Sequence, residues 1–137
     1  MMMSSQAGPR AVVAGHGTFA AALMSAVARI SGKAEVFVAV SNEGLDARGV
    51  EEAIGKALKQ HGASVIFTDL PAGSCTLAAR RIARLDSSIS IVTGATVAMV
   101  LDFALGAGAA EPDLRRAAES GRAAIVVYPA SGGAGGN

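Results

Sequence analysis

The stretch AVVAGHGT, residues 11–18, decides the fold of this chain. Four apolar residues closed by a glycine are typical of a short strand that is buried on both faces. Apolar residues then recur at helical spacing from Phe19 to Ile30, and Gly32 is placed to end that helix. A buried strand that leads directly into a helix predicts the β–α unit of a parallel sheet.

The same alternation of strand and helix continues along the chain. The next strands are short apolar runs at 36–40, 65–67 and 89–92. Helical stripes of apolar residues lie at 50–58, 75–85, 97–105 and 111–120, and a last strand is expected at 125–128. This order predicts an α/β fold: an open, doubly wound, mostly parallel sheet of four parallel strands plus a C-terminal edge strand, with helices on both faces.

The composition bounds the class of protein. The chain has 137 residues, of which 51% are hydrophobic and 17% are charged. That apolar content supports a packed core and excludes intrinsic disorder. We predict a single domain over residues 10–130, with flexible termini at 1–9 and 131–137. Twelve Lys and Arg against eleven Asp and Glu give a net charge of +1, so there is no basic excess to bind nucleic acid.

The cysteine count and the apolar runs bear on the compartment. A single cysteine excludes a disulfide framework and a cysteine-based zinc site, and it fits a reducing environment. The uncharged run at 11–28 resembles the apolar region of a signal peptide, but GHGT at 15–18 interrupts it. A helix that spans a membrane needs about 20 apolar residues, and this interrupted run does not supply them. We therefore expect a cytoplasmic protein with no membrane insertion.

Polar residues gather in the loops after the predicted strands, where open α/β sheets bind their ligands. His16 follows the first strand and Asp69 follows the third. A carboxylate that accepts from one ring nitrogen fixes the tautomer and leaves the other nitrogen with a free lone pair. Such an imidazole can accept a phosphoryl group where donors stabilise the phosphoryl oxygens. The candidate donors are the amides and hydroxyls of Gly17, Gly73, Ser74, Cys75, Thr76 and Thr96.

This site calls for no metal and no cofactor, because positioning and charge stabilisation are sufficient for transfer between carriers. Local structural roles are also expected for some of these residues. Ser74 is a good N-cap for the helix that follows it, and Cys75 is a small residue suited to packing. His61 lies at the end of a helix, where a cation suits the helix dipole.

Other functions remain open at this point. Residues 15–20, GHGTFA, match the Gly-x-Gly-x-x-Ala fingerprint of dinucleotide-binding folds, with Glu43 as a candidate ribose ligand. The alternative is therefore a small Rossmann-like nucleotide-binding or regulatory domain that uses Gly15 and Gly17. A receiver domain would need an acidic pair after the first strand, which this chain lacks. A pure interaction module would leave the polar residues at the strand ends without a role.

Three stretches resemble the mannose-type (mannose/fructose/sorbose) enzyme IIA of the bacterial sugar phosphotransferase system: residues 12–17, 66–74 and 92–99. The resemblance runs from about Val12 to Tyr128. It implies a phosphorylated histidine at His16, an active-site aspartate at Asp69 and a helix-start serine at Ser74. It also implies that phosphate arrives from the small carrier HPr and leaves to a IIB component, and that the protein is a homodimer in which the last strand is exchanged or edge-paired.

The chain departs from the family pattern at the rim of this site. Ala72 stands where the family commonly has glycine, and Thr96 and Ala98 stand where it commonly has asparagine and proline. The related phosphotransfer subunit of dihydroxyacetone kinase usually has serine in place of Gly17, which makes the sugar-specific IIA the nearer resemblance. These departures leave the sugar open.

Overall fold

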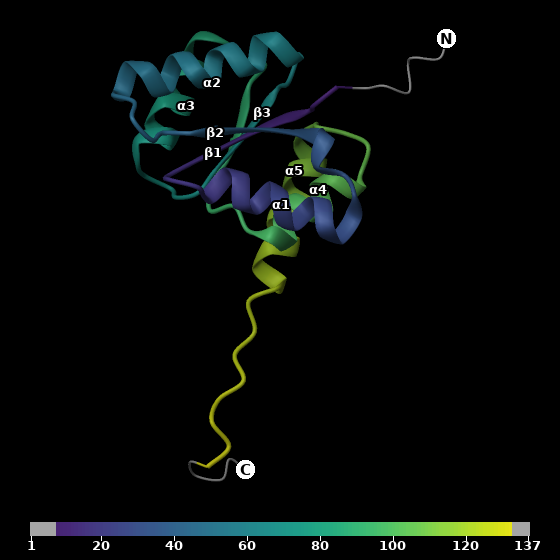
Figure 1. Ribbon diagram of the computed structural model, residues 1–137. Coiled ribbons are helices and arrows are strands. Elements are labelled where there is room, and N and C mark those ends of the chain that lie inside the picture. The colour runs from purple at the N-terminus through teal and green to yellow at the C-terminus, as the bar shows by residue number, and fades with distance from the viewer. Residues whose placement is uncertain (1–7, 133–137) are drawn as a thin grey trace.

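Residues 8–132 are described in the computed structural model, which contains a sheet of four parallel strands covered by helices (Figure 1). The strands are β1 (Ala11–Gly15), β2 (Phe37–Ser41), β3 (Val65–Thr68) and β4 (Ser90–Val92). The helices are α1 (Phe19–Ser31), α2 (Ala47–His61), α3 (Ser74–Leu85), α4 (Val97–Leu105) and α5 (Glu111–Ala123), with a short 3₁₀ turn, η2 (Ala34–Val36), before β2. The predicted α/β class and parallel sheet are confirmed.

The strand order is β2-β1-β3-β4, so β1 and β3 are the central pair although 49 residues separate their ends (Gly15 and Val65). The register pairs Gly15 with Ser41 of β2 and Ala14 with Thr68 of β3. Because all strands run in the same direction, the loops after β1, β2 and β3 lie beside one another at one edge of the sheet.

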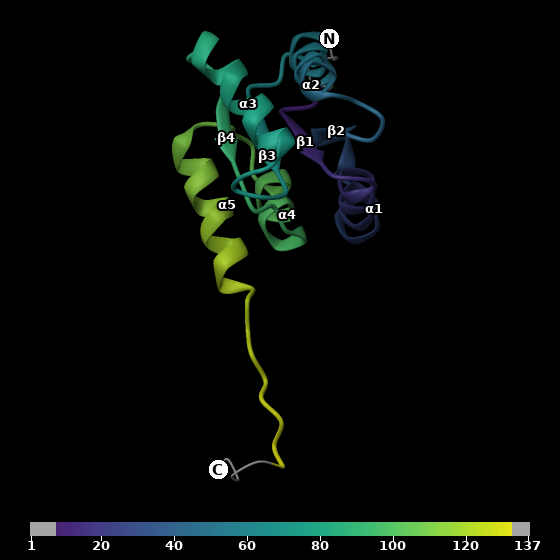
Figure 2. The ribbon, with the colours of Figure 1, turned by 90° about the vertical axis from the view of Figure 1, so that its left-hand side faces the viewer.

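The two faces of the sheet read directly from the alternation of side chains along each strand. Val13 and Phe67 belong to the cluster packed against α1, α4 and α5, whereas Val12 and Ile66 belong to the cluster packed against α2 and α3. Figure 2 shows these two layers of helices on opposite sides of the strands. All four of these side chains are fully buried, which explains why the strands are continuous apolar runs.

Arg10 fastens the start of β1 to the end of α4. Its guanidinium lies over the Phe103 ring at 4.8 Å from the centroid. It also donates to the carbonyl oxygens of Phe103 (2.7 Å) and Gly106 (3.0 Å). Both carbonyls lie at the C-terminus of α4, where a cation is favourable; the Phe103 oxygen also accepts from the Gly106 N–H at 3.2 Å.

The predicted C-terminal edge strand is not present. α5 continues to Ala123, three residues beyond the expected end at 120, and residues 125–128 form no strand. In Figure 1 the chain runs from α5 away from the sheet. The side chains of Ile125 to Tyr128 are 58–89% exposed, because this segment leaves the packed layers of the fold (Figure 1). The flexible termini predicted at 1–9 and 131–137 fall mostly outside the described residues.

Candidate functional site

His16 and Asp69 meet at the edge of the sheet where β1 and β3 end. The His16 Nδ1 atom lies 2.7 Å from Asp69 Oδ2, and the His16 backbone N–H donates to the same oxygen at 2.9 Å. The ring is 47% exposed, whereas the carboxylate is only 13% exposed. A largely enclosed carboxylate therefore holds an imidazole that is open to solvent.

This pairing fixes the roles of the two ring nitrogens. A carboxylate oxygen only accepts, so Nδ1 must carry the proton in this hydrogen bond and Nε2 keeps its lone pair. For Asp69, burial favours the neutral form, but the hydrogen bonds from the His16 ring and backbone outweigh it and hold the pKa of the carboxyl below its ordinary value. Asp69 is thus an ionised acceptor throughout the neutral range.

Two glycines make room for the ring and its partner. A Cβ at Gly15 would lie 2.5 Å from a Phe19 ring carbon and 3.2 Å from Asp69 Oδ2. Gly73 has a φ of +145°, which side chains rarely adopt, and a Cβ there would lie 3.2 Å from His16 Cε1 and 3.9 Å from Nε2. The absence of a side chain at Gly73 lets the start of α3 come close to the nitrogen that carries the lone pair.

The start of α3 differs from the sequence prediction. Ser74 is the first residue of the helix, and Gly73 is the N-cap, so no side chain caps these amides. The first hydrogen bond of the helix runs from the Leu77 N–H to the Gly73 carbonyl oxygen. The amides of Ser74 and Cys75 therefore have no partner within the helix, and the positive end of the helix dipole faces the region of Nε2. This arrangement suits an anion.

The structure does not bring every predicted phosphate ligand to the ring. The Thr76 side chain is buried, and its hydroxyl donates to the Leu70 carbonyl oxygen at 2.5 Å and contacts Thr68 Oγ1 at 2.6 Å. It therefore braces the loop that carries Asp69. The Thr96 hydroxyl accepts from the Met99 N–H and caps α4. Neither hydroxyl forms a hydrogen bond with His16 in the described part of the chain.

Cys75 contributes its backbone amide to the site, whereas its thiol points into the core. The side chain is fully buried in the cluster beneath α2 and α3. Burial raises the pKa of the thiol, and the negative charge of Asp69 raises it further. The thiol is therefore a poor nucleophile and serves as a packing residue.

Two residues that the sequence did not single out, Ser41 and Asn42, also belong to this site. Ser41 donates from its hydroxyl to the Gly17 carbonyl oxygen at 2.7 Å. The Asn42 amide accepts from the Gly17 N–H and donates to Ser74 Oγ, both at 3.2 Å. The sequence did contain a signal for these two residues: they are polar and directly follow the strand expected at 36–40, as the other site residues follow strands.

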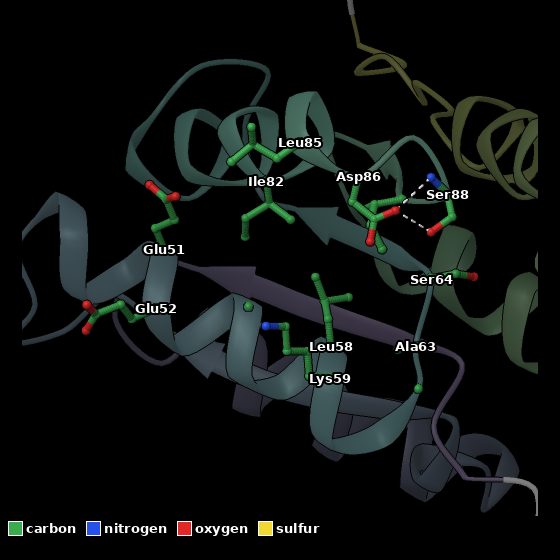
Figure 3. A pocket seen from close by; sticks show the side chains of 13 residues that line it. Glu51, Glu52, Leu58, Lys59, Ala63, Ser64, Ile82, Leu85, Asp86 and Ser88 are labelled. Atoms are coloured by element: carbon green, nitrogen blue, oxygen red, sulfur yellow. Dashed lines mark hydrogen bonds between the residues drawn. The ribbon is translucent and has the colours of Figure 1, made fainter.

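A hollow of about 640 Å³ lies elsewhere on the described surface. Figure 3 shows it between α2 and α3, with Leu58, Ile82 and Leu85 around it. Ser64 and Ser88, which also line it, come just before β3 and β4, so it lies at the amino ends of the strands. It contains none of the predicted site residues, and the His16 site is shaped by hydrogen bonds and amides at the opposite edge.

Comparison with known families bears on the functions left open by the sequence. The family model of the PTS system fructose IIA component (EIIA-man) matches residues 10–120. The chain belongs to this family. As a IIA protein it acts in a sugar phosphotransferase system. The two glycines of the Gly-x-Gly pattern, Gly15 and Gly17, lie within the matched region and flank His16. No curated protein matches it in sequence.

Solved structures share the fold of this IIA protein. The EIIA component of Streptococcus agalactiae is 18% identical, with a TM-score of 0.77, and the match covers 86% of this chain and 95% of that one. The mannose/sorbose-specific IIA subunit of Enterococcus faecalis is 18% identical, with a TM-score of 0.76 and coverage of 90% and 96%. At this identity the likeness shows the fold alone. Over residues 8–132 of the IIA chain, no helix is both long and apolar enough to cross a bilayer.

Proposed function

We propose that this IIA protein is a cytoplasmic phosphocarrier that accepts a phosphoryl group on His16 from HPr and passes it to a IIB component. The observation that carries the proposal is the 2.7 Å contact between His16 Nδ1 and Asp69 Oδ2, with the ring half exposed. The contact leaves Nε2 as the nucleophile. A partner's phosphohistidine can reach it because the ring faces solvent.

The transfer needs no external acid or base. The lone pair of Nε2 forms a bond to phosphorus while the bond from phosphorus to the donor nitrogen breaks, and that electron pair returns to the donor imidazole. Nδ1 keeps its proton, so the phosphorylated ring of His16 becomes cationic. Asp69 stabilises this cation through the hydrogen bond already formed. The step is reversible, as a carrier requires.

The start of α3 supplies the stabilisation of the phosphoryl oxygens. A Cβ at Gly73 would lie 3.9 Å from Nε2, so a phosphoryl group on that nitrogen lies against the Gly73–Cys75 amides. Free amides and the helix dipole stabilise its negative charge. The Ser74 hydroxyl is a further donor. Leu70 and Leu77, each half exposed, flank this loop and offer apolar surface that a docked carrier protein would cover.

The test is phosphorylation by phosphoenolpyruvate together with enzyme I and HPr. We expect one phosphoryl group per chain, lost in acid as phosphohistidine is, and discharged on addition of a IIB component. Binding of dinucleotides, followed by thermal shift, tests the nucleotide-binding alternative. A clear shift with dinucleotide and no phosphate uptake would replace the proposal.

We also propose that the protein is a homodimer in which residues 125–128 of one chain pair with a sheet of the other. Two observations support this pairing. β4 is an edge strand of the sheet, and its outer side has no partner strand in the described chain. The apolar side chains of Ile125 to Tyr128 are exposed, and their segment forms no helix or strand within its own chain. Light scattering should give twice the mass of the 13.6 kDa chain. Val127→Pro, which removes a ladder donor, should return the monomer mass; an unchanged dimer would exclude this pairing.

A further inference from the structure

The loop after β2 reaches the His16 site through the parallel register. Ser41 pairs with Gly15, and the next residue, Asn42, donates from its backbone N–H to the Gly15 carbonyl oxygen at 3.2 Å. The ladder between β1 and β2 thus continues for one hydrogen bond beyond β2. Asn42 is consequently fixed beside the turn that carries His16 and Gly17, and its half-buried side chain points into the site.

The orientation of the Asn42 amide follows from its partners. A backbone N–H can only donate, so the atom that receives the Gly17 N–H must be the amide oxygen. The amide nitrogen is then the atom that faces Ser74 Oγ, at 3.2 Å. It donates to the hydroxyl and occupies one of its lone pairs. The hydroxyl proton remains available for an acceptor on another side of Ser74.

We propose that Asn42 is a positioning residue that sets the Ser74 hydroxyl as a hydrogen-bond donor toward the phosphoryl group on His16, an inference that rests on the proposed function. The hydrogen bonds run in one direction, from the Gly17 N–H to the Asn42 amide and from that amide to Ser74. The Ser74 O–H is the last donor in this series of hydrogen bonds, and Gly73, the residue before Ser74, lies beside the imidazole. Donors aligned in series strengthen one another.

Asparagine is the residue type that this task requires. It must accept from the turn of His16 and donate to the start of α3, and a carboxylate of the same shape can only accept. With aspartate at this position the Ser74 proton would turn toward the carboxylate. The same substitution keeps the acceptor for Gly17, so it separates the direction of the Ser74 bond from the support of the His16 turn.

A double-mutant cycle tests the proposal. Initial rates of phosphate uptake from phosphorylated HPr are measured for the wild type, Asn42→Ala, Ser74→Ala and the double variant. We expect each single variant to lower kcat about tenfold, with the KM for phosphorylated HPr within about twofold of the wild type. Because Asn42 acts through Ser74, the double variant should be no slower than Ser74→Ala. Additive losses, or a change in KM without a change in kcat, would overturn the inference.

Asn42→Asp keeps the test decisive if the alanine variant does not fold. We expect it to melt within a few degrees of the wild type and to transfer phosphate at least as slowly as Ser74→Ala. A rate above that of Ser74→Ala contradicts the proposed direction of the hydrogen bonds. Gln60→Ala, an exposed amide near the end of α2, is the matched control and should transfer at the wild-type rate. Wild-type uptake is measured first, and its absence would reject the phosphocarrier function instead.

Discussion

The two histidines of this chain show what turns an imidazole into a site. His16 lies in the turn after β1, and its ring contacts a carboxylate that is 53 residues distant in sequence. His61 lies in the last turn of α2, is exposed, and forms no hydrogen bond through its ring in the described structure. Gly62 follows it with a φ of +68° and ends the helix. The residue type is the same, but only His16 stands where two neighbouring strands end.

Replacing each histidine in turn tests this contrast and should give the largest difference. His16→Ala should abolish phosphorylation by HPr, because it removes the accepting nitrogen, whereas His61→Ala should be phosphorylated like the wild type. Incorporation of phosphate from labelled phosphoenolpyruvate measures both. Both variants should fold, since neither side chain is part of the core. Full labelling of His16→Ala would show that the phosphoryl group is carried elsewhere.

A second comparison, between Asp69 and Asp86, should give a smaller difference in the rate of phosphate uptake. Asp69 and Asp86 both have a pKa below the ordinary carboxyl value. At Asp69, burial raises the pKa but hydrogen bonds from His16 outweigh it, and at Asp86 hydrogen bonds from Ser88 lower it. Only Asp69 touches a histidine. Asp69→Asn should slow phosphate uptake roughly 10- to 100-fold, because the amide stabilises the cationic ring less than a carboxylate does. Asp86→Asn should leave the rate unchanged. Equal rates for the two variants would deny Asp69 an orienting role.

The smallest effect concerns stability at low pH. Because the pKa of folded Asp69 lies below the ordinary carboxyl value of 3.8, the unfolded state binds more protons between the two pKa values. The stabilisation from Asp69 is present above the unfolded pKa and is lost as pH falls through the folded pKa. Urea unfolding of the wild type should therefore weaken more steeply below about pH 4 than that of Asp69→Asn. Parallel pH profiles would show that the carboxylate gains nothing on folding.

Residues in regular elements were predicted well because their signals are local. The apolar runs predicted β1 to β4 almost to their bounds. Gly32 ends α1 in the left-handed conformation, as expected, and Gly62 ends α2 in the same way. Three features of the ends were not predicted correctly. Gly73, not Ser74, is the N-cap of α3; Thr76 turns into the protein; and residues 125–128 pair with no strand. Each depends on how the end of an element is placed against the rest of the chain.

The continuous apolar runs and the helical stripes of apolar residues along this chain determined the layered α/β fold, since burial of each strand and each stripe is a property of neighbouring residues. The loops in which His16, Asp69 and Ser74 stand were determined in the same way. Their mutual geometry was not, because it depends on the strand order and on the register that sets Gly15 beside Ser41. Only the tertiary structure decided that Asp69 Oδ2 meets both the ring and the backbone of His16, and that Asn42 joins Gly17 to Ser74. Hydrogen bonds require atoms within about 3 Å, and a sequence specifies such distances only through the packing of the whole chain.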